Sequence, residues 1–185
     1  MGREVRRVPP DWQHPKNPRT GHYVPLRDGA DLKRATEEWD EAEKQWARGL
    51  RRSYTGQGWE PIGPKYRHLP FAEYDGARPD PADYMPVWAP EQATHLMMYE
   101  DTSEGTPISP AFATPEELAG WLADNNASAF ANMTASYAAW LRMIQAGWAP
   151  SAVGMGGRFM SGVEAAHALD AAHAPEVPTT PKETT

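Results

Sequence analysis

Apolar residues recur every three or four positions between residues 31 and 52, and this spacing predicts an amphipathic helix. The positions are Leu32, Ala35, Trp39, Ala42, Trp46 and Leu50. Residues three and four apart share one face of a helix, so these side chains are expected to form a single buried stripe. Acidic residues dominate the first part, and Arg48, Arg51 and Arg52 follow at the end, as the helix dipole favours. We therefore expect one helix over 31–52 with Trp39 and Trp46 buried.

The second half of the chain carries the pattern of a small β-α-α-β-β unit. Residues 94–101 form an apolar run typical of a strand. A helix over 114–125 should follow, because Thr114-Pro115-Glu116-Glu117 has the form of a capping box. A second helix is expected over 134–147, and two short strands, 152–155 and 158–162, flank Gly156-Gly157 as in a hairpin. The fold class predicted is α+β.

Prolines set the expected organisation of the remaining chain. Five of them fall in residues 1–30, where neither a helix nor a central strand is expected, so this part is predicted to be an extended N-terminal arm. Residues 53–93 hold seven more, together with seven aromatic residues, which predicts a segment that wraps the surface and presses rings into grooves. We expect a single domain over 31–174. The stretch 175–185 is expected to be a disordered and dispensable tail.

Composition narrows the class of protein. The chain has no cysteine, which excludes disulfides and thiolate chemistry and suits a reducing compartment. It has no apolar run approaching the roughly 18 residues that cross a membrane, and its basic start lacks the apolar stretch of a signal peptide. We expect a cytoplasmic protein with no membrane association.

Charge is distributed unevenly along the chain. Residues 1–60 contain 12 Lys and Arg against 10 Asp and Glu, whereas residues 61–185 contain 6 against 15. Binding to nucleic acid depends on neutralising phosphates, so a chain with a net charge of −7 is expected to bind it poorly. The candidate phosphate contacts are Arg3, Arg6 and Arg7 in the basic N-terminal arm.

Several stretches resemble a group of uncharacterised accessory proteins encoded by tailed phages and prophages. They begin with the signature REVRRVP (Arg3-Glu4-Val5-Arg6-Arg7-Val8-Pro9) and Trp12-Gln13-His14-Pro15. They continue with residues 99–110, residues 114–118, Gly147-Trp148-Ala149-Pro150-Ser151, Gly157-Arg158 and Ser161-Gly162-Val163-Glu164. The resemblance brings no activity with it. It implies an accessory protein made inside a bacterial host cell.

The densest set of chemical groups is the loop from Glu100 to Glu104. Its three carboxylates and two hydroxyls are of the kinds that bind Mg²⁺ or act as acid and base, but their spacing matches no known metal loop. The histidines lack the spacing of a metal motif, and Gly154-Met155-Gly156-Gly157-Arg158 lacks the Lys-Ser/Thr of a phosphate loop. No metal or cofactor is expected, and the tryptophans are more simply explained as core than as a stacking platform.

These observations favour a phage-encoded, non-enzymatic binding protein that acts on a host or phage macromolecule, with inhibition of a host defence system as one form of that role. The expected partner is a protein, such as a basic nucleic-acid-binding protein of the host, because acidic and aromatic groups are available to contact it. The binding residues predicted are Glu100, Asp101, Glu104, Trp59, Tyr84, Trp88, Arg6 and Arg7. A small metal-dependent hydrolase or transferase using the Glu100–Glu104 loop, or a structural component of the virion, stays open as an alternative. The oligomeric state is undetermined by the sequence.

Overall fold

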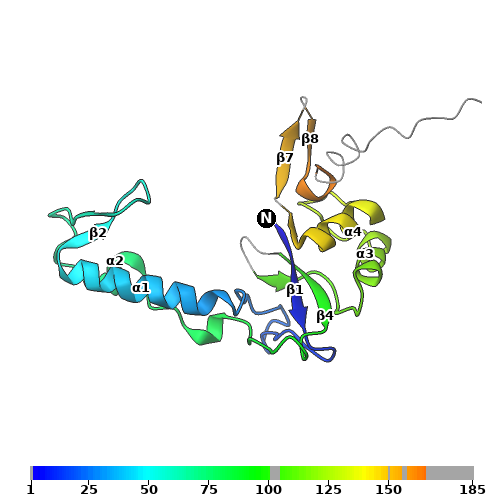
Figure 1. Cartoon of the computed structure of the whole chain (residues 1–185), viewed down its shortest axis with the longest axis horizontal. Coiled ribbons are helices and arrows are strands. Elements are labelled where there is room, and N and C mark those ends of the chain that lie inside the picture. The colour runs from blue at the N-terminus through cyan, green and yellow to red at the C-terminus, as the bar shows by residue number, and fades with distance from the viewer. Residues whose placement is uncertain (1, 101–104, 150, 156–157, 166–185) are drawn as a thin grey trace, which may run out of the picture. The chain divides into compact units, whose positions relative to one another are not determined.

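The computed structural model describes residues 2–100, 105–149, 151–155 and 158–165 (Figure 1). It is a mixed α+β protein whose paired strands are antiparallel. Its contacts divide the chain into two compact units: unit 1 is Met1–Val24 with Trp88–Thr185, and unit 2 is Pro25–Val87. This division differs from the single domain expected over 31–174, because residues 1–24 pack with the second half of the chain. The expected tail, 175–185, lies outside the described residues.

Unit 1 is built on a four-stranded sheet in the order β5-β4-β1-β6. The strands are β1 (Arg3–Val8), β4 (His95–Glu100), β5 (Thr106–Pro107) and β6 (Trp148–Ala149). Strand β1 pairs along its whole length with β4, with Val5 opposite Met98 and Arg6 opposite Met97. Opposed residues of an antiparallel pair share a face, so Val5 and Met98 lie on one side of the sheet and Arg6 and Met97 on the other.

The interior strand β1 contradicts the expectation that residues 1–30 hold no central strand. The prolines begin only at Pro9, just after the strand ends. The three arginines of the strand obscured its pattern, yet two of them are buried with partners. Arg3 donates from Nε to the Ser128 carbonyl (2.8 Å), and Arg6 donates from Nε to Glu4 (3.0 Å). These contacts satisfy charges that the sequence suggested were solvated.

Two helices cover one face of this sheet, α3 (Pro115–Asp124) and α4 (Tyr137–Ala146). Leu118, Leu122 and Trp140 are completely buried against Leu96 and Met98 of β4. The capping box predicted at the start of α3 is confirmed: Thr114 Oγ1 accepts from Glu117 N and the Glu117 carboxylate accepts from Thr114 N, both at 3.2 Å. The helix pair therefore supplies the apolar core of unit 1.

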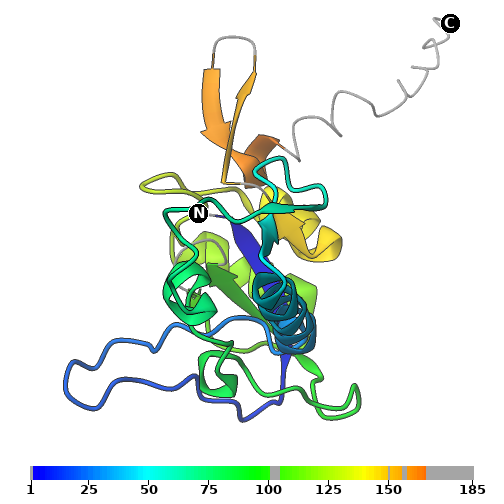
Figure 2. The ribbon, with the colours of Figure 1, turned by 90° about the vertical axis from the view of Figure 1, so that its left-hand side faces the viewer.

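The last elements of unit 1 are β7 (Ala152–Met155) and β8 (Arg158–Ser161), which pair antiparallel as the sequence predicted. They form a separate two-stranded sheet instead of joining β4. Figures 1 and 2 show this hairpin extending away from the four-stranded sheet. The expected β-α-α-β-β unit is thus replaced by a sheet completed by β1, β5 and β6, none of which the sequence pattern indicated.

Unit 2 contains the long helix α1 (Asp31–Ala47), followed by the antiparallel pair β2 (Leu50–Arg52) and β3 (Trp59–Pro61). The helix expected over 31–52 therefore ends earlier. Gly49 adopts a positive φ of 83°, a conformation that closes a helix and that glycine reaches without strain. Residues 50–52 then turn into a strand that the helical spacing did not predict.

Aromatic rings pack helix α1 against α2 (Phe71–Asp75) in unit 2, and a 3₁₀ turn (Pro81–Asp83) follows. Phe71 is buried between Trp39 (ring centroids 5.1 Å apart) and Trp46 (5.8 Å), and Tyr74 stacks on Trp46 at 4.4 Å. Trp46 Nε1 donates to the Leu69 carbonyl at 3.1 Å. Both tryptophans are half-buried, so their complete burial was a wrong prediction.

Candidate binding site

Unit 1 has a groove of about 830 Å³ at the β5 edge of its four-stranded sheet. Its walls come from the loop that follows β1, from the β5 edge and from α3. They consist of Pro10, Trp12, Gln13, His14, Pro15, Lys16, Tyr23, Met97, Pro107, Ile108, Ser109, Pro110, Ala111 and Trp121. Figure 2 shows residues 9–24 as the long blue loop. We call this hollow the aromatic groove.

The loop is held in place by Tyr99, the buried tyrosine of β4. Trp12 Nε1 donates to the Tyr99 hydroxyl at 3.2 Å, and the Trp12 ring meets the edge of Trp88 at 4.8 Å. His14 is also buried; its Nδ1 lies 3.1 Å from the Tyr99 hydroxyl and its Nε2 lies 2.7 Å from the Val24 carbonyl. The Arg6 guanidinium covers the Tyr99 ring at 4.5 Å.

Burial sets the protonation of this network. The pKa of His14 lies below its ordinary value chiefly because burial penalises the imidazolium; the Val24 carbonyl opposes this, and Arg6 adds to the lowering. Burial also raises the pKa of Tyr99 to about 12. A carbonyl only accepts, so the proton of neutral His14 is on Nε2, and Nδ1 accepts from the Tyr99 hydroxyl. Trp12 and His14, which line the groove, are therefore linked through Tyr99 by a chain of neutral hydrogen-bonding groups.

The walls of the groove are mainly apolar. Among the described residues that line it, Lys16 is the only one with a full charge at neutral pH, and its ammonium lies 4.7 Å from the Tyr23 ring centre. The Ser109 hydroxyl already accepts from Met98 N (2.9 Å) and donates to the Pro110 carbonyl (2.8 Å). The groove thus offers rings and prolines for contact, with the polar groups of His14 and Ser109 committed to the fold.

A second hollow of about 610 Å³ adjoins the aromatic groove, and the two share Ala111 and Trp121. It is lined by His95, Phe112, Ala113, Gly120 and the acidic residues Glu117 and Asp124. Trp121 is half-buried and therefore lies between an apolar and an acidic hollow. A partner that fills both would need an apolar anchor next to positive charge.

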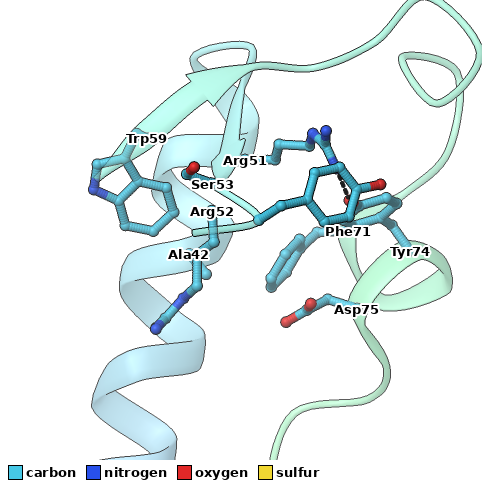
Figure 3. A pocket seen from close by; sticks show the side chains of 9 residues that line it. Ala42, Arg51, Arg52, Ser53, Trp59, Phe71, Tyr74 and Asp75 are labelled. Atoms are coloured by element: carbon cyan, nitrogen blue, oxygen red, sulfur yellow. Dashed lines mark hydrogen bonds between the residues drawn. The ribbon is translucent and has the colours of Figure 1, made fainter. Parts of the chain in front are cut away.

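Unit 2 has a smaller pocket of about 120 Å³ at the β2–β3 hairpin, which we call the hairpin pocket (Figure 3). Four aromatic residues line it, together with two arginines and one carboxylate. The lining is Ala42, Arg51, Arg52, Ser53, Tyr54, Trp59, Phe71, Tyr74 and Asp75.

The structure separates the binding residues predicted from the sequence. Trp59 and Tyr84 belong to unit 2, whereas Glu100 and Trp88 belong to unit 1. Trp59 is at the surface and lines the hairpin pocket, but Tyr84 is buried. Glu100 is half-buried at the end of β4, and the rest of that loop, including Asp101 and Glu104, lies outside the described residues.

The basic arm also differs from its prediction. Arg6 is buried under Tyr99 and paired with Glu4, so it is not a solvated phosphate contact; Arg7, on the other face of β1, is exposed. Sequence reasoning missed Trp12, His14 and Trp121 as site residues. The available signal was Trp12-Gln13-His14-Pro15, an aromatic and polar cluster in a proline-rich stretch.

The described residues contain neither a cluster of metal-binding side chains nor a membrane-spanning helix. No three His, Cys, Asp or Glu side chains there are grouped as a metal ion would require. None of the described helices combines the length and the apolar character needed to span a bilayer.

No protein-family model, curated protein or solved structure matches this chain.

Proposed function

We propose that this protein is a non-enzymatic binding protein that holds a protein partner in the aromatic groove of unit 1. The observation that supports the proposal most is the groove itself: about 830 Å³, walled by Trp12, Tyr23 and Trp121, beside an acidic hollow. Interfaces of this kind place rings at the centre and charges at the rim. The resemblance to phage accessory proteins supports a role in a bacterial host cell, such as inhibition of a defence system.

The partner expected is basic at its contact surface. Unit 1 carries 8 Lys and Arg against 13 Asp and Glu, and Glu117 and Asp124 lie beside the groove. Complementary charge accelerates the encounter, while buried rings determine how slowly the complex dissociates. A nucleic-acid-binding protein of the host has the surface charge that this arrangement favours.

The test is capture of the partner from a host lysate by the full chain and by two matched variants. Trp121→Ala removes the ring between the two hollows. Tyr137→Ala removes an exposed ring of the same unit that lines neither hollow. We expect Trp121→Ala to lose a captured protein that Tyr137→Ala retains, with both variants folded by circular dichroism. Equal capture by wild type and folded Trp121→Ala would contradict the proposal.

The charge component is tested separately with Glu117→Gln and Asp124→Asn combined. Glutamine keeps the hydrogen bond of the capping box, so the fold of α3 should be retained. We expect slower association with the captured protein and a weaker dependence of its rate on salt. An unchanged salt dependence would show that the acidic hollow is not part of the interface.

A further inference from the structure

The hairpin pocket of unit 2 has rigid aromatic walls. Figure 3 shows Trp59 and Arg52 on one side, with Phe71, Tyr74 and Asp75 on the other. Tyr74 is fixed by its stack on Trp46 at 4.4 Å, and the Arg52 guanidinium lies 5.6 Å from the Trp59 ring centre. Because these contacts exist without a ligand, little ordering is needed when one binds.

The two arginines of the pocket differ in the hydrogen bonds and ion pairs that they make within the protein. Arg51 pairs with Glu60 (2.5 Å), donates to the Tyr74 hydroxyl (3.1 Å) and stacks over Tyr54, 84% of which is exposed. Arg52 is exposed, and its Nη2 donates to the Glu38 carbonyl at 3.1 Å. In the described part of the chain no carboxylate pairs with Arg52, since that of Glu38 is held by Arg34. Its charge is available to an anion.

Asp75 supplies the opposite charge. Asp75 is exposed at the end of α2, and its carboxylate has no hydrogen bond or ion pair with any described residue. The pocket therefore presents an uncommitted carboxylate and an uncommitted guanidinium beside a set of rings. An apolar side chain would use neither charge, and a simple anion would use neither the rings nor Asp75.

We infer that the hairpin pocket binds a nucleobase that carries a phosphate. A flat base stacks on the rings, Asp75 accepts hydrogen bonds from amino and imino groups of the base edge, and Arg52 contacts the phosphate. The small volume of the pocket, about 120 Å³, suits one flat ring system better than a peptide segment. Guanine is the preferred base, because its N1–H and amino group face one carboxylate together.

This inference is independent of the proposed function in unit 1, and it revises the expectation that direct contact with nucleic acid is unfavourable. That expectation rested on the net charge of −7, which weakens binding along many phosphates. A site for one base and one phosphate depends on stacking and on Arg52. The same chemistry is present in a free nucleotide and in a single strand.

The experiment is calorimetric titration of the full chain with guanosine 5′-monophosphate, adenosine 5′-monophosphate, guanosine and a guanine-containing single-stranded octanucleotide. We expect the guanine nucleotide to bind more tightly than the adenine nucleotide. Asp75→Asn should reduce affinity for it by about tenfold and remove the preference. Arg52→Gln should weaken the nucleotide but leave guanosine unchanged. Tighter binding of the octanucleotide than of the mononucleotide would identify a strand as the source, and the reverse would identify a free nucleotide.

Two matched controls keep the charge change but lie outside the pocket: Glu73→Gln on α2 and Arg48→Gln before β2. Both should bind as wild type does. All four substituted residues are exposed, so the fold should be retained, and circular dichroism checks this. The inference is overturned if no guanine ligand binds at millimolar concentration, if Asp75→Asn and Arg52→Gln bind as the controls do, or if free tryptophan binds more tightly than the nucleotides.

Discussion

The two units are stabilised in different ways, although both depend on tryptophan. In unit 1, Trp140 of α4 is completely buried in the core that α3 and α4 form with β4, among side chains such as Leu118, Leu122 and Met98. In unit 2, Trp39 and Trp46 are half-buried, and their indole N–H groups donate to the Gly76 and Leu69 carbonyls. A tryptophan at helical spacing therefore does not by itself indicate a closed core. In unit 2 the rings stay partly accessible, and the hairpin pocket forms beside them.

The largest effect should come from Trp140→Ala. Removing a fully buried tryptophan costs about 3–5 kcal/mol, because lost burial is combined with a cavity. The indole Nε1 of Trp140 has no hydrogen-bond partner among the described residues, so Trp140→Phe should cost much less. Urea denaturation followed by circular dichroism measures both. Equal losses for the two variants would show that ring volume is not what stabilises unit 1.

A smaller effect is expected from Trp46→Ala in unit 2. The change removes a half-buried ring, its stack on Tyr74 and one hydrogen bond, worth about 2 kcal/mol together. The same urea titration gives the value. A loss as large as that of Trp140→Ala would remove the contrast between the two units.

The helix caps of unit 1 provide the next test. Thr114→Ala removes the acceptor for Glu117 N and should cost about 1 kcal/mol, whereas Thr114→Ser should cost little. Thermal unfolding distinguishes them. An unchanged melting temperature for Thr114→Ala would mean that water replaces the cap without loss.

The smallest effect should be a pH dependence that is specific to unit 1. His14 has a folded pKa below its ordinary 6.5, so the unfolded chain binds more protons and stability decreases as pH falls from 6.5 towards the folded pKa. Protonation also gives Nδ1 a proton that opposes the Tyr99 hydroxyl. Melting temperatures between pH 7.5 and 4.5 should therefore fall less steeply for His14→Gln than for wild type. Parallel curves would indicate that His14 is not the titrating group.

Local signals predicted part of this structure well. Thr114 and Glu117 mark the start of α3 because a capping box involves four consecutive residues, and the β7–β8 pairing follows from a short turn. Strand β1 was missed because two of its arginines are buried, Arg3 by donating to the Ser128 carbonyl and Arg6 by pairing with Glu4, and no apolar alternation marks such positions. Helix α1 was extended too far because apolar spacing continues through Leu50, although Gly49 ends the helix.

The candidate sites were harder to predict than the elements. The aromatic groove joins the loop after β1 to Met97, to the β5 edge and to Trp121, which are more than seventy residues away in sequence. That Trp59 contacts a partner stays a prediction; the pocket that it lines depends on the rings of α2, which the sequence did not place beside it. Both hollows are formed by segments that are distant in sequence. The periodicity of apolar residues along the chain does not indicate which of these segments pack together.

The position of β1 has a consequence for synthesis on the ribosome. This strand is made before unit 2 and before its partner β4, which begins 87 residues after Val8, with the whole of unit 2 encoded between them. At a translation rate of about 5–20 residues per second, β1 waits roughly 4–17 s for that partner. During this interval unit 2 can complete its local contacts, while an unpaired strand with three arginines remains exposed. Those charges discourage the strand from pairing with the wrong edge before β4 emerges.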